Sequence, residues 1–160
     1  MDIREKITDF SRGDELSGFW RLYRKRERTK NKLFKDVLTF FLSRMAHRRG
    51  GYIGNGAELC DVPSLPHGLH GIYISRYAKI GANCRIYQNV TIGEVGGAAP
   101  QIGDCCLIGA GAVIIGGIKI GNNVKIGAGA VVSSDMPDNC TVVAQPPRII
   151  KRECANACNG

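Results

Sequence analysis

Residues 50–151 are predicted to form a parallel β-helix, a solenoid in which the chain winds in three-sided coils around one continuous core. Two observations predict this fold. An aliphatic residue returns every six positions, and glycine, which occurs only twice before residue 50, occurs nineteen times from there on. A coil with three flat faces must turn every six residues, and glycine accepts the unusual φ values of those corners. The remainder of the fold is a short α-helical arm at the N-terminus, so the chain is predicted to be mainly β.

The six-residue period runs through two unbroken series of aliphatic residues. They are Ile74, Ile80, Ile86 and Ile92, and then Ile102, Ile108, Ile114, Ile120, Ile126 and Val132. Four residues after most of these comes a residue that is nearly always small: Ala78, Cys84, Val90, Cys106, Ala112, Val124 or Ala130. We expect the aliphatics to stack coil on coil, with the small residues in the tight corner beside them. A helical interpretation fails, because glycine this frequent destabilises helix interiors.

The period is interrupted at two places. Between Ile92 and Ile102 the spacing is ten, so four extra residues within 94–100 are expected to bulge from the coil. The phase is also lost before Ile74, through residues 61–71, which contain two of the three histidines. Insertions in a solenoid become loops and often form its binding face.

The N-terminal region is predicted to be helical. Apolar residues recur there at steps of three and four with Lys and Arg between them: Leu33, Phe34, Val37, Leu38, Phe40, Phe41 and Met45. A second helix is predicted over 15–26, and Gly50-Gly51 is expected to end the arm. The expected organisation is therefore a helical arm at 1–49, a β-helix at 50–151 and a flexible tail at 152–160.

The composition favours one globular domain in the cytoplasm. The chain has 160 residues, 44% hydrophobic and 22% charged, with no apolar run of membrane-spanning length and no apolar segment at its start. The net charge of +8 belongs to the arm, because residues 1–50 hold 14 Lys and Arg against 7 Asp and Glu, whereas the rest hold 8 against 7. We expect a solvated helix face and no nucleic-acid partner. An anionic partner, or a membrane surface beside Phe40 and Phe41, is the alternative for this basic run.

The seven cysteines are expected to be thiols. Their number is odd, no pair of CxxC motifs is present, and a cytoplasmic chain keeps cysteines reduced. Cys84 and Cys106 are expected to pack at the small position of the repeat. We expect no metal site, and the pair Cys154 and Cys158 lies in the polar tail.

At this point the sequence resembles a known family. The runs PHGLHGIYISRYAKIGANCRIYQNVTIG and PQIGDCCLIGAGAVIIGGIKIGNNVKIGAGAVV, with the ending MPDNCTVVAQPPRII, are similar to the serine acetyltransferase branch of the hexapeptide-repeat acyltransferases. That branch also includes O-acetyltransferases of capsular and other polysaccharides. The resemblance covers about residues 50–151. It implies a left-handed β-helix, a homotrimer with sites between subunits, and an acetyl-CoA-dependent O-acetyltransferase.

The resemblance implies a histidine base before the Gly-Ile-x-Ile strand, which here is 71–74. The reaction needs a base to take a proton from the attacking hydroxyl, and the pKa of an imidazole lies near neutral pH. His67 matches the Pro-His-Gly pattern of the shorter relatives, and His70 is expected to contact substrate. Asp61 is the candidate carboxylate that orients the base, with Glu58 second, although Asp61 can equally cap a turn.

The resemblance also implies where the acetyl donor lies. Ala110 and Ala128 match positions whose backbones contact the pantetheine arm, and Gln88 keeps its match at the substrate site. The glycines Gly93, Gly109, Gly111 and Gly127 are expected to help bind the cofactor. Arg148 and Lys151 are candidates for the phosphates of CoA, although both can be plain solvated charges.

Two departures from the family pattern leave the acceptor open. Enzymes that act on serine carry an acid directly before the base and a histidine before the proline that ends the loop, and Pro66 and Ala99 occupy these positions. A sugar hydroxyl of a polysaccharide is therefore the alternative to free serine. More distant alternatives are a non-catalytic scaffold and a metal-dependent β-helix enzyme, which needs three histidines, whereas His47 lies in the arm. Stacking of trimers into hexamers stays open.

Overall fold

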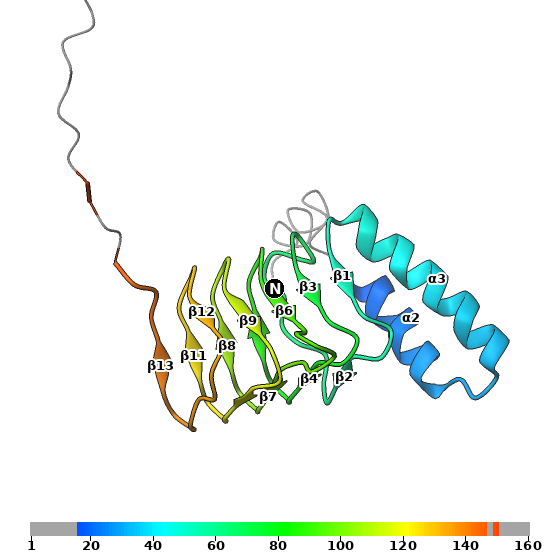
Figure 1. Cartoon of the computed structure of the whole chain (residues 1–160). Coiled ribbons are helices and arrows are strands. Elements are labelled where there is room, and N and C mark those ends of the chain that lie inside the picture. Colours follow the sequence, from blue (N-terminus) through cyan, green and yellow to red (C-terminus); the bar gives the residue numbers. More distant parts are fainter. Residues whose placement is uncertain (1–15, 147–148, 151–160) are drawn as a thin grey trace, which may run out of the picture.

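In the computed structural model, which describes residues 16–146 and 149–150, two helices precede a three-sided solenoid (Figure 1). The helices are α2 (Ser17–Arg28) and α3 (Lys32–Arg48). The first was predicted two residues too early, at 15–26. Asn31 caps α3, because its side chain accepts a hydrogen bond of 3.1 Å from the backbone N–H of Phe34. None of the described helices has the length and hydropathy that a membrane span requires.

The solenoid is a left-handed parallel β-helix built from three sheets, so the predicted fold class is confirmed. Sheet A contains β1 (Tyr52–Ile53), β3 (Tyr73–Ile74), β6 (Thr91–Gly93), β9 (Val113–Ile115) and β12 (Val131–Val132). Sheet B contains β2 (Glu58–Leu59), β4 (Lys79–Ile80), β7 (Gln101–Ile102) and β10 (Lys119–Ile120). Sheet C contains β5 (Arg85–Ile86), β8 (Leu107–Ile108), β11 (Lys125–Ile126) and β13 (Thr141–Val142).

The six-residue series form the core in register. In sheet A, Ile74 pairs with Ile92, Ile92 with Ile114, and Ile114 with Val132. Sheets B and C repeat the arrangement with Ile80, Ile102 and Ile120, and with Ile86, Ile108 and Ile126. All ten of these side chains are almost completely buried. The small position of the repeat is buried too, as predicted.

Two of the three corners repeat a residue with positive φ from coil to coil. The corner between sheets C and A, called here the CA corner, has Gly50, Gly71, Asn89, Gly111 and Gly129. The corner between sheets B and C, the BC corner, has Asn83, Cys105, Asn123 and Asn139. Each coil must turn sharply at these points, and Gly and Asn tolerate the left-handed conformation best.

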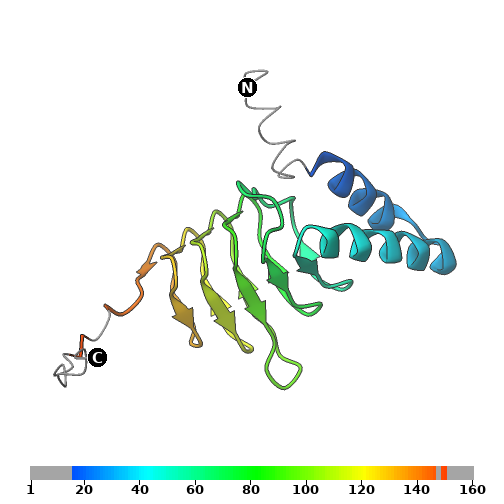
Figure 2. The same cartoon turned by 90° about the horizontal axis from the view of Figure 1, so that it is seen from above.

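Both interruptions of the period form loops. After β6 the chain makes a two-residue hairpin in which Val95 and Ala98 exchange backbone hydrogen bonds, and Gly96 and Gly97 have φ of 59° and 82°. Figure 2 shows this loop projecting beyond the neighbouring coils. Ala99 is already buried in the core again. The other interruption is a series of turns that leads into β3.

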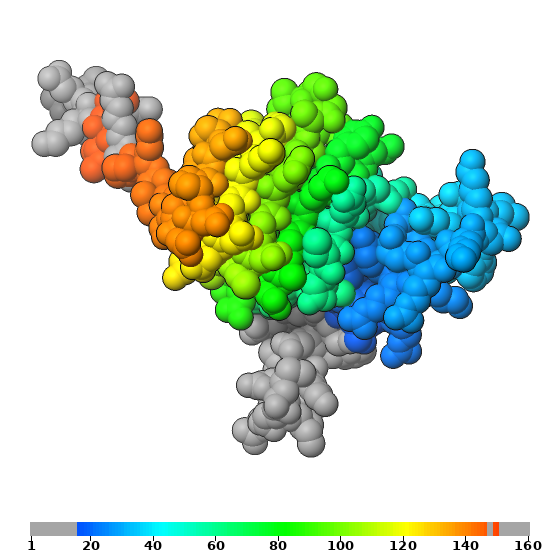
Figure 3. Space-filling view, turned by 90° about the horizontal axis from the view of Figure 1, so that it is seen from below, coloured from blue at the N-terminus to red at the C-terminus, as the bar shows by residue number. Residues whose placement is uncertain are grey.

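The helical arm covers the N-terminal end of the solenoid (Figure 3). Phe19 and Trp20 of α2 and Leu42 and Ala46 of α3 join the same buried cluster as Ile53 of β1. The arm therefore shares one core with the coils. Successive coils then follow one another away from the arm, towards β13 at the other end (Figure 1).

Candidate functional site

The CA corner brings together four of the residues predicted to bind substrate or cofactor. His70, Gln88, Ala110 and Ala128 each precede the positive-φ residue of their coil. Backbone hydrogen bonds of 2.9–3.0 Å join one coil to the next along this line, from Asn89 to the carbonyl of His70, from Gly111 to that of Gln88, and from Gly129 to that of Ala110. We call His70, Gln88, Ala110 and Ala128 the corner column. The sequence alone did not show that they lie one above another.

His67 lies beside the corner column. It is exposed, in the turns that precede β3, and its ring centroid is 6.0 Å from that of Tyr87, the residue before Gln88. The aromatic neighbour was not predicted. His70 is exposed as well. The two histidines that the interruption holds are thus both placed at the CA corner, at its end nearest the helical arm.

Two polar atoms near this end of the column are buried without a hydrogen-bond partner in the described residues. They are Oε1 of Gln88 and Nε of Arg49, whose next residue, Gly50, is the first positive-φ residue of the CA corner. Leaving a buried polar group unpaired costs about 1–3 kcal/mol. Arg49 Nη1 donates to the backbone carbonyl of Met45, so that side chain belongs to the helical arm, and only Gln88 lies in the corner column.

The part of the corner column farther from the helical arm, at Ala110 and Ala128, offers a surface for a thin, amide-bearing ligand. Ala110 is half-buried and Ala128 is exposed, and their backbone N–H groups donate no hydrogen bond within the described residues. A methyl group added at Gly111 or Gly129 would meet no atom within 4 Å, so the corner is open. By contrast, a methyl group at Gly109 would lie 2.6 Å from the backbone nitrogen of Ala128, so the coils themselves pack tightly there. The residues present therefore fit the pantetheine arm of acetyl-CoA.

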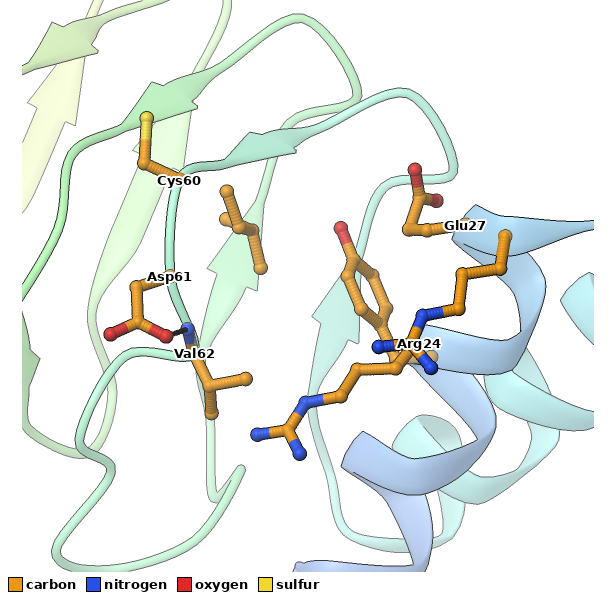
Figure 4. Close-up of a pocket in the computed structure, with 8 residues that line it drawn as sticks. Arg24, Glu27, Cys60, Asp61 and Val62 are labelled. Carbon is orange, nitrogen blue, oxygen red and sulfur yellow. Dashed lines mark hydrogen bonds between the residues drawn. The ribbon is translucent and has the colours of Figure 1, made fainter.

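Asp61 lies away from the corner column. It follows β2 at the BC corner, where its carboxylate accepts a hydrogen bond of 2.7 Å from the backbone N–H of Val62. With Cys60 and Val62 it lines a cavity of about 200 Å³, towards which Arg24 of α2 extends (Figure 4). No hydrogen bond in the described part of the chain joins Asp61 to His67. The structure thus shows the turn-capping alternative for Asp61 and does not bring it to the base within one chain.

Gly93 lies at the far edge of sheet A from the corner column. It ends β6 and lines a shallow groove of about 320 Å³ on the outer face of the sheet, together with Tyr52 and Tyr73. The two tyrosine rings lie 6.5 Å apart, and beside them Ser75 Oγ donates a 2.5 Å hydrogen bond to Glu94 Oε2. This groove was not predicted, although tyrosines at the outward positions of two paired strands were a visible signal.

Gly127 is half-buried at the CA corner, whereas Arg148 and Lys151 lie outside the described residues.

The five described cysteines are free thiols. Cys84 and Cys106 are buried at the small position of adjacent coils, as predicted. The hydrogen bond with Cys106, together with burial, raises the pKa of the Cys84 thiol above its ordinary value. Among the described residues no three His, Cys, Asp or Glu side chains are grouped so that they could hold a metal ion.

Comparisons with known proteins identify the family of the chain. Residues 99–134 match the family described as bacterial transferase hexapeptide (six repeats). The serine acetyltransferase of Synechococcus elongatus is 43% identical over 107 residues, which cover 64% of this chain and 43% of that protein. That of Staphylococcus xylosus is 38% identical over 136 residues, covering 82% and 59%.

Solved structures give the same relationship. The crystal structure of Neisseria gonorrhoeae serine acetyltransferase in complex with serine superposes with a TM-score of 0.68 at 38% identity, covering 82% of this chain and 55% of that one. The apoenzyme of soybean serine acetyltransferase gives 0.63 at 37% identity, covering 72% and 49%. The chain spans about half the length of the relatives that it matches. On its repeat, its fold and these matches, the chain belongs to the hexapeptide-repeat transferase family, in which the relatives that it resembles are serine acetyltransferases.

Proposed function

We propose that the protein is an O-acetyltransferase that uses acetyl-CoA as donor, with His67 as the general base. One observation carries the proposal: an exposed histidine, an unpartnered buried amide oxygen and an open stripe of small residues follow one another along a single corner of the solenoid. Such an order suits a base, an acceptor position and a donor channel. The relationship to serine acetyltransferases supports the same activity.

In this proposal the chain binds and orients two substrates and moves one proton. The free N–H groups of Ala110 and Ala128 hold the pantetheine amides of acetyl-CoA, which supplies an activated acyl thioester. The imidazole of His67 accepts the proton of the attacking hydroxyl and returns it to the CoA thiolate, which leaves as the ester forms, while the side chain of Gln88 contacts the acceptor. Asp61 acts at a distance, because its carboxylate fixes the turn at the start of the segment that carries His67. Arg148 and Lys151 stay predictions for the CoA phosphates.

Serine, or a hydroxyl compound like it, is the acceptor that the relatives favour. The crystal structure of the Neisseria gonorrhoeae relative is a complex with serine, and that chain is 38% identical to this one. The groove on sheet A favours a second candidate, a sugar. Tyr52 and Tyr73 offer aromatic surface there, and Ser75 and Glu94 offer polar groups, whereas Pro66 and Ala99 supply no charge to hold a free amino acid.

We also propose a homotrimer with active sites between subunits, which the resemblance to the family implies. An open donor stripe on one corner is what a site completed by a neighbouring chain requires. We place the protein in the cytoplasm, with its cysteines as thiols; the five described cysteines are free.

Replacement of His67 tests the proposed base. We expect His67→Ala to lower the rate of acceptor-dependent thiol release from acetyl-CoA by about 100- to 10,000-fold, because general-base catalysis contributes that much. Binding of CoA, measured by calorimetry, should be unchanged, since His67 is exposed and no core contact is lost. The control is His47→Ala, an equally exposed histidine of α3.

Assays of wild type and variant with serine, homoserine and a panel of sugars would identify the acceptor. Activity of His67→Ala close to that of wild type would refute His67 as the base. If the wild type binds CoA but releases no thiol from acetyl-CoA with any of these acceptors, the result would count against acetyltransferase activity altogether.

A further inference from the structure

The outer face of α3 exposes an apolar strip. Four side chains form it, and their exposed fractions are 76% for Leu33, 43% for Val37, 60% for Phe40 and 54% for Phe41. Their spacing of four, three and one residues places them all on one side of the helix. The opposite side contacts the core through a different set of residues: Leu38, Leu42 and Ala46. The helix α3 therefore has two apolar faces, and only one of them packs against the core. Solvation of four large apolar side chains on one helix face is unfavourable.

Positive charge surrounds this strip. Residues 16–50 contain eleven Lys and Arg against two acidic side chains, Glu27 and Asp36. Lys30 and Lys32 lie at the N-terminal end of α3, and Arg44 and Arg48 at its C-terminal end, all exposed. The strip is thus bounded by cations at both ends.

The neighbouring helix extends the same surface. Lys25 of α2 places Nζ 5.5 Å from the centre of the Phe34 ring, and Phe34 is itself 44% exposed beside the strip. Arg21, Lys25 and Arg28 lie at steps of four and three along α2, so they share one exposed face. A surface formed by both helices therefore combines aromatic and aliphatic groups with a row of cations.

We propose that this surface binds an anionic lipid bilayer, with the strip of Leu33, Val37, Phe40 and Phe41 in the boundary between headgroups and acyl chains. Helices that lie in that plane have an apolar face flanked by Lys and Arg. Each cation near an anionic membrane surface strengthens binding about fivefold. This peripheral association goes beyond the proposed acetyl transfer and does not depend on it.

Two other occupants fit the surface less well. A second copy of the chain would bring two arms of net charge +7 together, and like charges repel. A nucleic acid would match the charge, but it offers no apolar partner for four exposed aliphatic and aromatic side chains. Of these three, the anionic bilayer satisfies both the charge and the apolar area.

The bilayer would also orient the site. The buried face of α3 packs against β1, the first strand of the solenoid, and the coils continue away from the arm (Figure 1). Because His67 and His70 precede β3, which pairs directly with β1, the base would be near the lipid surface. Ala110 and Ala128 lie on later coils, so the donor channel would extend away from the membrane.

Sedimentation with vesicles tests the proposal on the full chain. We expect binding to vesicles of phosphatidylcholine with about 30% phosphatidylglycerol, little binding to phosphatidylcholine alone, and loss of binding in 0.5 M salt. The double variant Phe40→Ser/Phe41→Ser should bind at least about tenfold more weakly, because its substitutions remove apolar area that only the bilayer covers. The control Val143→Ser replaces another exposed apolar residue on the solenoid and should bind like wild type.

A charge variant provides a second readout. Lys30→Glu/Lys32→Glu should weaken vesicle binding by more than tenfold, whereas Lys119→Glu/Lys125→Glu, which changes the same charge on the solenoid, should not. Vesicle binding that is absent, or unchanged in Phe40→Ser/Phe41→Ser with an intact circular dichroism spectrum, overturns the proposal. A lower oligomer mass for Phe40→Ser/Phe41→Ser than for wild type also overturns it, because that result assigns the strip to contact with a second copy of the chain. Stronger binding of the wild type to DNA than to vesicles overturns it as well.

Discussion

Five residues other than glycine hold a positive φ in the described part of the chain, and four of them are asparagine. The fifth is Cys105, with φ of 57°, in the BC corner between Asn83 and Asn123. Asparagine suits this position twice over, because it tolerates the left-handed conformation and its side chain can bond to the next coil. Asn123 does so, donating from Nδ2 to Oδ1 of Asn139 at 2.9 Å. Cys105 is the exception in an otherwise regular ladder.

Replacement of this cysteine should stabilise the protein. We expect Cys105→Asn to raise the free energy of unfolding by about 1 kcal/mol, since the left-handed conformation costs an ordinary residue about 1–2 kcal/mol. Cys105→Ala is the control that removes the thiol without relieving the backbone, and it should stay within about 0.5 kcal/mol of wild type. Urea denaturation of the three proteins measures the difference. A Cys105→Asn midpoint at or below that of wild type contradicts this account of the corner.

The coil is the scale at which sequence reasoning succeeded best. Register follows from the period, so the aliphatics at 74, 92, 114 and 132 stack as expected. Helix α3 shows the limit of the same reasoning, because an apolar pattern does not say which of two faces meets the core. The pattern predicted a helix, but only Leu38 of the seven residues that predicted it is buried. The predicted domain boundary after residue 49, between the helical arm and the β-helix, stays a proposal. The arm and the β-helix share one hydrophobic core.

The CA corner also gives a prediction at the scale of one structural element. Ala110→Leu should weaken CoA binding at least about tenfold, because a branched side chain would occupy the open stripe that the pantetheine arm needs. Ala82→Leu places the same side chain at a half-buried position of the BC corner and should bind CoA like wild type. Calorimetric titration with CoA compares them. Equal affinities for all three proteins would remove the donor from the CA corner.

At the scale of the whole molecule, the three sheets present different outer faces. Sheet A shows only uncharged residues at its first outward position: Tyr52, Tyr73, Thr91, Val113 and Val131. Sheet B presents Glu58, Lys79 and Lys119 there, and sheet C presents Arg85 and Lys125. Because charged residues are depleted from the centres of interfaces, sheet A is the face that we expect between subunits of the proposed trimer.

A single charge on sheet A should therefore disrupt the trimer. Val131 is 67% exposed in one chain, and Val131→Glu would bury three carboxylates in the assembly. Sedimentation equilibrium should give about three times 17.3 kDa for wild type and 17.3 kDa for the variant. Lys125→Glu on sheet C is the control and should stay trimeric. A monomeric wild type, or a trimeric Val131→Glu, would exclude this interface.

Sequence reasoning found most of the candidate site but not its arrangement. Different motifs predict His70, Gln88, Ala110 and Ala128. Their common corner depends on how two insertions displace the register, which only the folded coil shows. Asp61 illustrates the reverse case. It precedes His67 by six residues, yet one flat face of the coil separates them, so closeness in sequence says little about closeness at a corner. The groove beside Tyr73 depends on the pairing of two strands 21 residues apart, so the two tyrosines were visible in the sequence but their closeness was not.

The central claim is that one corner of the solenoid carries both the base and the donor, and a crystal structure of the protein with CoA bound tests it most directly. We predict the pantetheine arm along Ala110 and Ala128, with its amides bonded to their backbone groups and its sulfur facing His67. Binding of CoA along the BC corner, or on the outer face of sheet B or C, would contradict the account.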